Sequence, residues 1–217
     1  MVYNVTMRRT PSLNRGFTLT ELLVTLSIFV FMTALIVSKY GAFNQNTFLT
    51  DTAYDIALNI HTAQTYGVSV KGTDYTDPNF GGASQTFDTA YGVDMFTSPG
   101  LNKLTYLFTD SDKNGVYNPG ELEIPSNLAR GAYISAFCVG TGPADCKTDP
   151  HSIGSPIAHA SVAFKRPNPD ALISVDDTTP PGTMEQWPYL QITVTSSDGS
   201  NSRTVFVRQN GQISVGN

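Results

Sequence analysis

The hydrophobic positions of this 217-residue chain form three successive patterns. The first is an apolar stretch over residues 17–37, in which the polar exceptions are mostly hydroxyl side chains. As a helix rising about 1.5 Å per residue, these 21 residues would be about 31 Å long, close to the ~30 Å hydrocarbon thickness of a bilayer. The pattern therefore predicts a membrane-spanning helix near the N-terminus.

The second pattern is a stripe of apolar residues at helical spacing, separated alternately by four and three positions. Its members are Leu49, Ala53, Ile56, Ile60 and Ala63. No proline occurs between Pro11 and Pro78, so we expect one long helix from Phe17 to about Tyr66. Gly67 is the expected C-terminal stop of this helix.

The third pattern, beyond Gly72, consists of short alternating runs and turn signals, which predict strands. Asp198-Gly199 and Asn210-Gly211 are typical of hairpin turns, so the last three strands should form an antiparallel meander. Residues 74–90 and 176–187 are predicted to be loops. The predicted strands are residues 91–95, 104–108, 132–138, 160–164, 190–195, 204–208 and 212–215. The expected fold class is α+β, with a mostly antiparallel sheet.

Charge changes the interpretation of the apolar stretch. Residues 1–16 contain Arg8, Arg9 and Arg15 and no acid, so this leader should stay cytoplasmic. Glu21 lies almost at the start of the apolar stretch, where a charge is costly and calls for a partner cation. In an ordinary secretory signal the apolar core precedes the cleavage site. Here a cut after Gly16 would leave the apolar helix on the mature chain.

The sequence RGFTLTE at residues 15–21 resembles the class III signal of type IV pilins and type II secretion pseudopilins. The resemblance implies that a prepilin peptidase cuts between Gly16 and Phe17, that Phe17 becomes a methylated N-terminus, and that Glu21 carries an assembly role. It also implies a long helix that lies half in the membrane and half against a sheet. Thr20 departs from the family, which more often has an aliphatic residue there.

The assembly role of Glu21 has a physical basis. The freed amino group of Phe17 would be cationic, and pairing it with Glu21 of a neighbouring subunit removes two charges from hydrocarbon together. Subunits stacked in this way form an open helical assembly. The alternative is a plain signal anchor whose Glu21 sits at the lipid interface. The expected regions are a leader at 1–16, a transmembrane assembly helix at 17–40, an amphipathic helix at 41–72 and a β-rich head at 73–217.

Composition limits the classes of function. The formal net charge is −5 and becomes −8 without the three leader arginines, which argues against nucleic-acid binding. No G-x-S-x-G elbow or phosphate-binding glycine loop is present, so we expect no enzyme. We expect His61 to be solvated and His159 to be structural, and His151 carries no assignment.

Residues 110–121 fit the calcium-loop pattern D-x-[DN]-x-[DN]-G-x5-E. They resemble EF-hand and dockerin loops, although the flanking helices are missing. Calcium prefers six to eight oxygen ligands, which alternate residues of such a turn can supply. The expected ligands are Asp110, Asp112, Asn114, the Val116 carbonyl, Asn118 and Glu121. The alternative is a polar surface turn that binds no ion tightly.

Cys138 and Cys146 are the two cysteines of the chain. A local disulfide is expected if the head is exported, and two buried thiols are the alternative. A zinc site is disfavoured because, even with His151, only three nitrogen or sulfur ligands lie nearby.

Together these features predict a structural subunit of a type IV pilus or a related secretion filament. It would be membrane-anchored before assembly and then part of a periplasmic or extracellular filament. Its partners would be other copies or homologous pilins, the prepilin peptidase and the assembly platform. Two alternatives are a DNA-capturing minor pilin and a membrane-anchored surface module, such as a hydrolase, that does not polymerise. The first would use Lys165, Arg166, Arg203 and Arg208.

Overall fold

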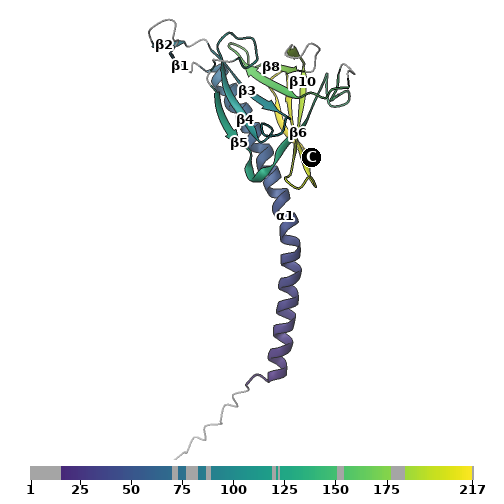
Figure 1. Ribbon diagram of the computed structural model, residues 1–217. Coiled ribbons are helices and arrows are strands. Elements are labelled where there is room, and N and C mark those ends of the chain that lie inside the picture. The colour runs from purple at the N-terminus through teal and green to yellow at the C-terminus, as the bar shows by residue number, and fades with distance from the viewer. Residues whose placement is uncertain are drawn as a thin grey trace, which may run out of the picture. The chain divides into compact units, whose positions relative to one another are not determined.

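A computed structural model describes residues 16–69, 73–76, 83–86, 89–118, 121, 123–150, 154–176 and 184–216. The chain divides into two compact units, Met1–Phe43 and Asn44–Asn217. We call the second unit the head. All of the predicted leader except Gly16 lies outside the described residues, as does His151. One helix, α1 (Leu19–Val68), has 50 residues, which confirms the single long helix predicted from the sequence (Figure 1).

Within its described residues the head contains sheets of six, four and two strands, and every strand pairing in them is antiparallel. The six-stranded sheet has the order β5-β4-β3-β7-β8-β9, and the four-stranded sheet has the order β12-β11-β10-β6. The α+β class is therefore confirmed. The strands are β1 (Thr73–Thr76), β2 (Ala83–Thr86), β3 (Ala90–Phe96), β4 (Leu104–Asp110), β5 (Glu123–Asn127), β6 (Tyr133–Gly140), β7 (His159–Phe164), β8 (Ala171–Asp176), β9 (Met184–Gln186), β10 (Tyr189–Thr195), β11 (Ser202–Arg208) and β12 (Ile213–Gly216).

The core of the head is built on the predicted apolar stripe of α1. Each of its five members is at most 2% exposed, and all belong to one hydrophobic cluster with residues from both larger sheets. Val93 and Val162 represent the six-stranded sheet in this cluster, and Ile192 and Val205 represent the four-stranded sheet. The period-3.6 stripe on the helix and the period-2 faces of the strands therefore bury one another.

All seven predicted strands are present, within two residues at each end. Both hairpin turns are also confirmed, with Gly199 and Gly211 at positive φ between β10, β11 and β12. β5 and β8 were not predicted from the sequence. The prediction of loops at 74–90 and 176–187 was wrong, because β1 and β2 lie in the first segment and β9 in the second. β5 carries Pro125, which is tolerated because β5 is an edge strand with one unpaired side.

Gly67 does not end α1 as predicted, because the helix continues to Val68 and the Ser69 N–H still donates to the Thr65 carbonyl. Its role is close packing. A Cβ at Gly67 would collide with the backbone carbonyl of Phe164, the last residue of β7. The absence of a side chain therefore lets the helix backbone approach the sheet backbone directly.

Gly67→Ala should lower the free energy of unfolding by about 1–3 kcal/mol, because a backbone carbonyl has to move to admit the new methyl group. Thermal unfolding of the full chain in detergent, followed by circular dichroism, measures the effect. Gly142→Ala is the matched control, since a Cβ there meets nothing within 4 Å and should change stability by less than about 0.5 kcal/mol. Equal melting temperatures for the two variants would contradict the packing role of Gly67.

Candidate functional site

The first candidate site is the N-terminal part of α1. Its residues Leu19–Ser38 have a mean hydropathy of 2.2 in their most apolar window, and none of that window is buried within the molecule. By length and composition this segment can cross a membrane. Thr25, Ser27 and Thr33 donate their hydroxyl protons to carbonyls three or four residues earlier. These polar groups are therefore satisfied within the helix and are compatible with lipid.

Glu21 forms a capping box with Thr18 at the start of α1. The Thr18 N–H donates to Glu21 Oε2 at 3.0 Å, and the Glu21 N–H donates to Thr18 Oγ1 at 3.2 Å. The Thr18 hydroxyl donates to the same carboxylate oxygen at 2.8 Å. This reciprocal pattern satisfies helix N–H groups that have no carbonyl partner. The sequence analysis missed the cap, although the T-x-x-E spacing indicates it. The cap supplies hydrogen bonds to the carboxylate but no opposite charge.

The predicted cleavage junction lies just before this cap. Gly16 and Phe17 precede the helix in irregular backbone, and the Phe17 side chain is 86% exposed. A peptide bond outside a helix, flanked by exposed residues, is accessible to a peptidase. The predicted junction therefore lies in non-helical backbone immediately before α1, and Glu21 lies in the first turn of that helix.

The second candidate site is the loop of residues 110–121, which leaves the end of β4. Atoms of the Asp110, Asp112 and Glu121 carboxylates all lie within 4.8 Å of one another. Asp110 is fully buried, and it accepts hydrogen bonds from the N–H groups of Asn114 (3.1 Å) and Gly115 (2.9 Å). Gly115 has a φ of 85°, which a glycine adopts without strain. The predicted acidic ligands are thus brought together.

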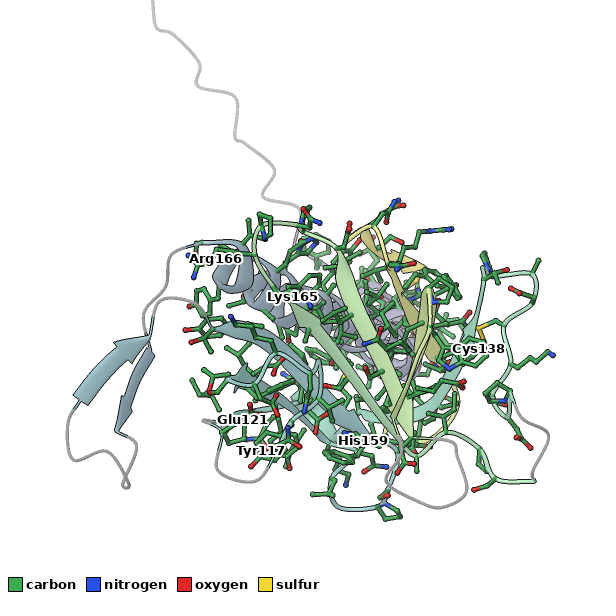
Figure 2. The ribbon with its side chains drawn as sticks, turned by 90° about the horizontal axis from the view of Figure 1, so that it is seen from above. Tyr117, Glu121, Cys138, His159, Lys165 and Arg166 are labelled. Carbon is green, nitrogen blue, oxygen red and sulfur yellow. A yellow bond between two sulfur atoms is a disulfide. The ribbon has the colours of Figure 1, made fainter. Side chains whose placement is uncertain are left out.

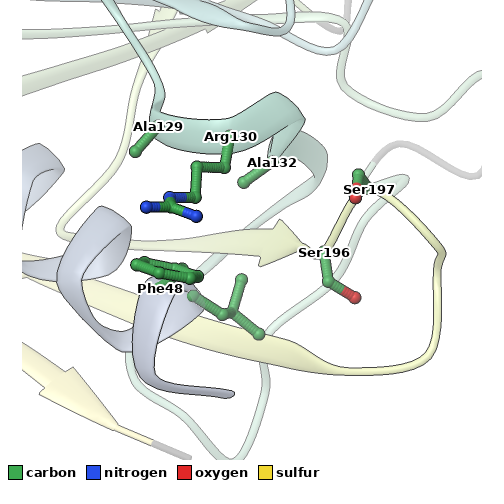
Figure 3. Close-up of a pocket in the computed structure, with 7 residues that line it drawn as sticks. Phe48, Ala129, Arg130, Ala132, Ser196 and Ser197 are labelled. Carbon is green, nitrogen blue, oxygen red and sulfur yellow. The ribbon is translucent and has the colours of Figure 1, made fainter. Parts of the chain in front are cut away.

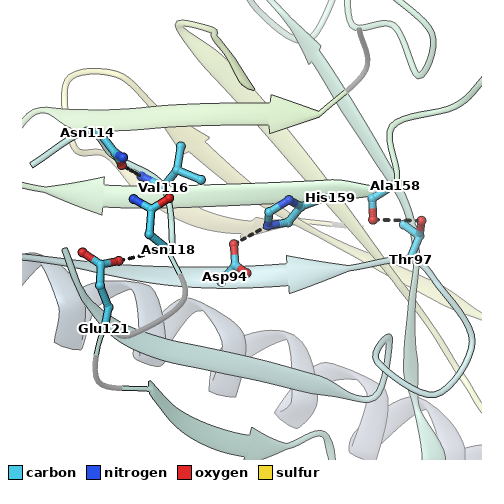
Figure 4. Close-up of polar contacts among 8 residues, drawn as sticks. All are labelled: Asp94, Thr97, Asn114, Val116, Asn118, Glu121, Ala158 and His159. Atoms are coloured by element: carbon cyan, nitrogen blue, oxygen red, sulfur yellow. Dashed lines mark hydrogen bonds and ion pairs between the residues drawn. The ribbon is translucent and has the colours of Figure 1, made fainter. Parts of the chain in front are cut away.

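The remaining predicted ligands complete a closed hydrogen-bonded loop (Figure 4). Glu121 accepts from the Asn118 N–H at 2.9 Å, and Asn114 Oδ1 accepts from the Val116 N–H at 2.8 Å. The side-chain amides of Asn114 and Asn118 both donate to Asp112 Oδ2. These two amides would have to turn to present their oxygens to a cation. The donor set, carboxylate and amide oxygens around one turn, fits a hard cation such as Ca²⁺.

The electrostatics of this loop also favour a cation. The pKa of Asp110 is raised to about 6, mainly by burial; the neighbouring carboxylates of Asp112 and Glu121 contribute to the rise, and the Gly115 N–H opposes it. Burial likewise raises the pKa of Glu121. Three carboxylates held together therefore repel one another near neutral pH, and a bound cation would offset that repulsion.

The loop folds over the face of the six-stranded sheet that points away from α1. The Tyr117 ring packs edge-on against Phe108, with centroids 5.9 Å apart, and a Cβ at Gly115 would lie 3.2 Å from Leu172 Cβ on β8. Phe108 is 1% exposed, and its ring lies over Gly92, where a side chain would collide with it. The loop therefore covers a second, smaller group of packed apolar side chains on this face of the sheet.

An Asp94–His159 pair lies on the same face, near the loop residues (Figure 4). Asp94 Oδ1 and His159 Nε2 are 2.5 Å apart, and the imidazole stacks on Phe96 with centroids 4.5 Å apart. Burial raises the pKa of Asp94, and the hydrogen bond from His159 partly opposes that shift. The pair ties β3 to β7. Its members are 65 residues apart, so nothing in the sequence pointed to it.

The two cysteines form a disulfide, as predicted, with Cα atoms 5.4 Å apart (Figure 2). Next to it, Val139 and Lys147 exchange two backbone hydrogen bonds, and the Asp145 carboxylate accepts from the N–H groups of Thr141 and Gly142. The bond therefore closes a short, internally hydrogen-bonded turn at the end of β6.

The four basic residues considered for DNA binding do not all lie at one end of α1, because Arg203 lies apart from Lys165 and Arg166. Lys165 and Arg166 lie together just after β7 (Figure 2), next to the carbonyl that meets Gly67. Arg203 instead donates to the Thr50 hydroxyl at 3.2 Å. Thr50 and Gly67 are 17 positions apart on α1, about 25 Å at ~1.5 Å per residue. DNA capture stays a prediction that this arrangement does not favour.

One hollow lies between α1 and the 3₁₀ turn at Ala129–Gly131 (Figure 3). Its free volume is about 10 Å³, room for roughly one water molecule, which is too small for an organic substrate. The lining residues are Phe48, Leu49, Ala129, Arg130, Ala132, Ser196 and Ser197.

Comparison with known proteins gives one match. A family profile described as the prokaryotic N-terminal methylation motif matches residues 11–37. No curated protein and no solved structure matches the chain. The matched residues include the Gly16–Phe17 junction, Glu21 and most of the apolar segment. The match confirms the prepilin-type motif predicted from residues 15–21 and supports a protein of the type IV pilin and pseudopilin kind.

Proposed function

We propose that this chain is a structural subunit of a type IV pilus or a secretion pseudopilus. In this proposal it inserts into the membrane through Leu19–Ser38, is cut by a prepilin peptidase between Gly16 and Phe17, and is methylated on Phe17. The match of the methylation motif to residues 11–37 carries the proposal. The exposed, non-helical junction directly before the cap of α1 supports it.

Assembly in this proposal takes place through α1. The amino group of Phe17 in one copy neutralises Glu21 of the next copy inside the hydrocarbon, where an unpaired carboxylate is costly. The same interface repeated from copy to copy gives an open filament. The heads are then carried outside the membrane, and the partners are other copies or homologous pilins, the peptidase and the assembly platform. The work of the chain is mechanical, with no catalytic step.

Mass spectrometry of the protein purified from its own membranes tests this function. The mature chain should begin at Phe17 and carry one added methyl group on that residue. The intact-mass measurement and the N-terminal peptide give the result directly. Retention of residues 1–16 in all of the purified protein would contradict the proposal and leave a plain signal anchor.

We also propose that residues 110–121 hold a structural Ca²⁺ ion. Asp110, Asp112, Asn114, the Val116 carbonyl, Asn118 and Glu121 would be the ligands. The clustered carboxylates and the raised pKa of Asp110 support this assignment. The ion would hold the loop over Phe108 and Leu172, which stabilises the face of the sheet that the loop covers.

Calcium at 1 mM should raise the melting temperature of the full chain by about 3–6 °C. For a dissociation constant near ~10⁻⁴ M the binding contributes about 1.4 kcal/mol, and a domain of this size shifts by ~2–4 °C per kcal/mol. Asp112→Asn should remove most of that rise while leaving the melting temperature in chelator nearly unchanged, because Asp112 is exposed.

Two controls accompany this measurement. Asp170→Asn changes an exposed aspartate outside the loop and should keep the full response to calcium. Alanine at Asp110 is not suitable, because that buried carboxylate also accepts two backbone hydrogen bonds and its loss would destabilise the loop in any buffer. Identical melting of the unmodified chain in calcium and in chelator would refute the site.

A further inference from the structure

One face of α1 is left bare by its own head. Opposite the buried stripe, Tyr54 is 59% exposed and Leu58 is 62% exposed, and the exposed residues Asp51 and Asp55 flank them. Tyr54 and Leu58 are one helical turn apart, so their side chains are neighbours. Neither Asp51 nor Asp55 accepts a hydrogen bond or pairs with a cation within the part of the chain that the structure describes. We call these four residues the bare face of α1.

A cation of the same head, Arg130, packs on an aromatic ring of α1. Arg130 is exposed, and its guanidinium carbon lies 3.5 Å from the centre of the Phe48 ring (Figure 3). The residue has a φ of 51°, a left-handed conformation that is uncommon for a residue with a side chain. Among the described residues Arg130 has no carboxylate partner. Its N–H donors are therefore oriented by the ring but unused.

These two surfaces are complementary in chemistry but displaced along the helix. Phe48 precedes Asp51, the first residue of the bare face, by three positions and Leu58, the last, by ten, which is about 5–15 Å at ~1.5 Å per residue. Residues 44–217 contain 17 acidic and 9 basic residues, so two heads repel one another unless opposite charges meet. Arginine and tyrosine are also enriched in the centres of protein interfaces.

We propose that the bare face of α1 binds a second copy of this chain through Arg130. Arg130 of one copy pairs with Asp51 and Asp55 of the next, and Tyr54 and Leu58 pack at the same contact. Because the two surfaces differ, the contact is heterologous, and each copy still offers one free surface of each kind. The displacement along α1 then repeats from copy to copy. This proposal rests on the filament function above and names the head contact that accompanies it.

Charge reversal in the full chain tests the pairing. Two variants each place like charges at the contact: the single variant Arg130→Glu, and the double variant Asp51→Arg with Asp55→Arg. Each should lower the yield of sheared filaments about tenfold. The combination of all three substitutions should restore the yield. Lys147→Glu and Asp170→Arg reverse exposed charges elsewhere and should leave it unchanged. Unchanged yield in both the Arg130 variant and the Asp51/Asp55 double variant, or no recovery when the three substitutions are combined, would overturn the pairing.

Cross-linking gives a readout that does not require filaments. Arg130→Lys keeps the positive charge and supplies an amine that a carbodiimide joins directly to a carboxylate. In membranes containing a mixture of ¹⁵N-labelled and unlabelled chains, we expect a peptide linking position 130 of one isotope to Asp51 or Asp55 of the other. Links only within one copy, links only to a different protein, or no link would refute the proposed contact. A mature chain that begins at Phe17 together with such a negative result would retain the filament function and remove this inference alone.

Discussion

The apolar half of α1 needs an environment that this molecule does not provide. None of its side chains is buried along Leu19–Ser38, and its backbone and hydroxyl groups are satisfied within the helix. Hydrocarbon is a favourable environment for every part of this segment except the carboxylate of Glu21. Thr18 donates hydrogen bonds to that carboxylate but leaves its charge uncompensated. In the proposed filament, the cation is the N-terminus of an adjoining copy, the group that cleavage after Gly16 would create.

The second half of α1 packs within the head. Its stripe from Leu49 to Ala63 is buried by both larger sheets, so the head has a complete core of its own. Gly67 allows the helix end to approach β7, and the loop of residues 110–121 covers the far side of the six-stranded sheet. The disulfide closes the turn at the end of β6, and the Asp94–His159 pair links β3 to β7. Within the part of α1 that packs in the head, Tyr54 and Leu58 of the bare face stay exposed, and the proposed contact between heads uses this face.

Local patterns in the sequence predicted the parts of the fold that local patterns control. The 4-3-4-3 stripe, the seven alternating strands and the two glycine turns were all found, because helix and strand periodicity are set by burial on one face. The three carboxylates of the calcium-loop pattern lie close together, as their spacing predicted. β5 and β8 were missed because prolines lie within or beside them, and β9 because it has only three residues. The role of Gly67 and the pairing of Asp94 with His159 depend on contacts between segments far apart in the chain, which no local pattern encodes.

The most direct measurement compares filament formation by Glu21→Gln, Glu21→Val and the unmodified chain. Glutamine preserves the capping partner of Thr18 but cannot carry a negative charge, whereas valine removes both properties. If the charge of Glu21 pairs with the amino group of the next copy, both variants should insert into the membrane yet yield at least about tenfold fewer filaments. Normal filament yield from Glu21→Gln would show that the carboxylate serves only as a helix cap, and assembly through charge pairing would be wrong.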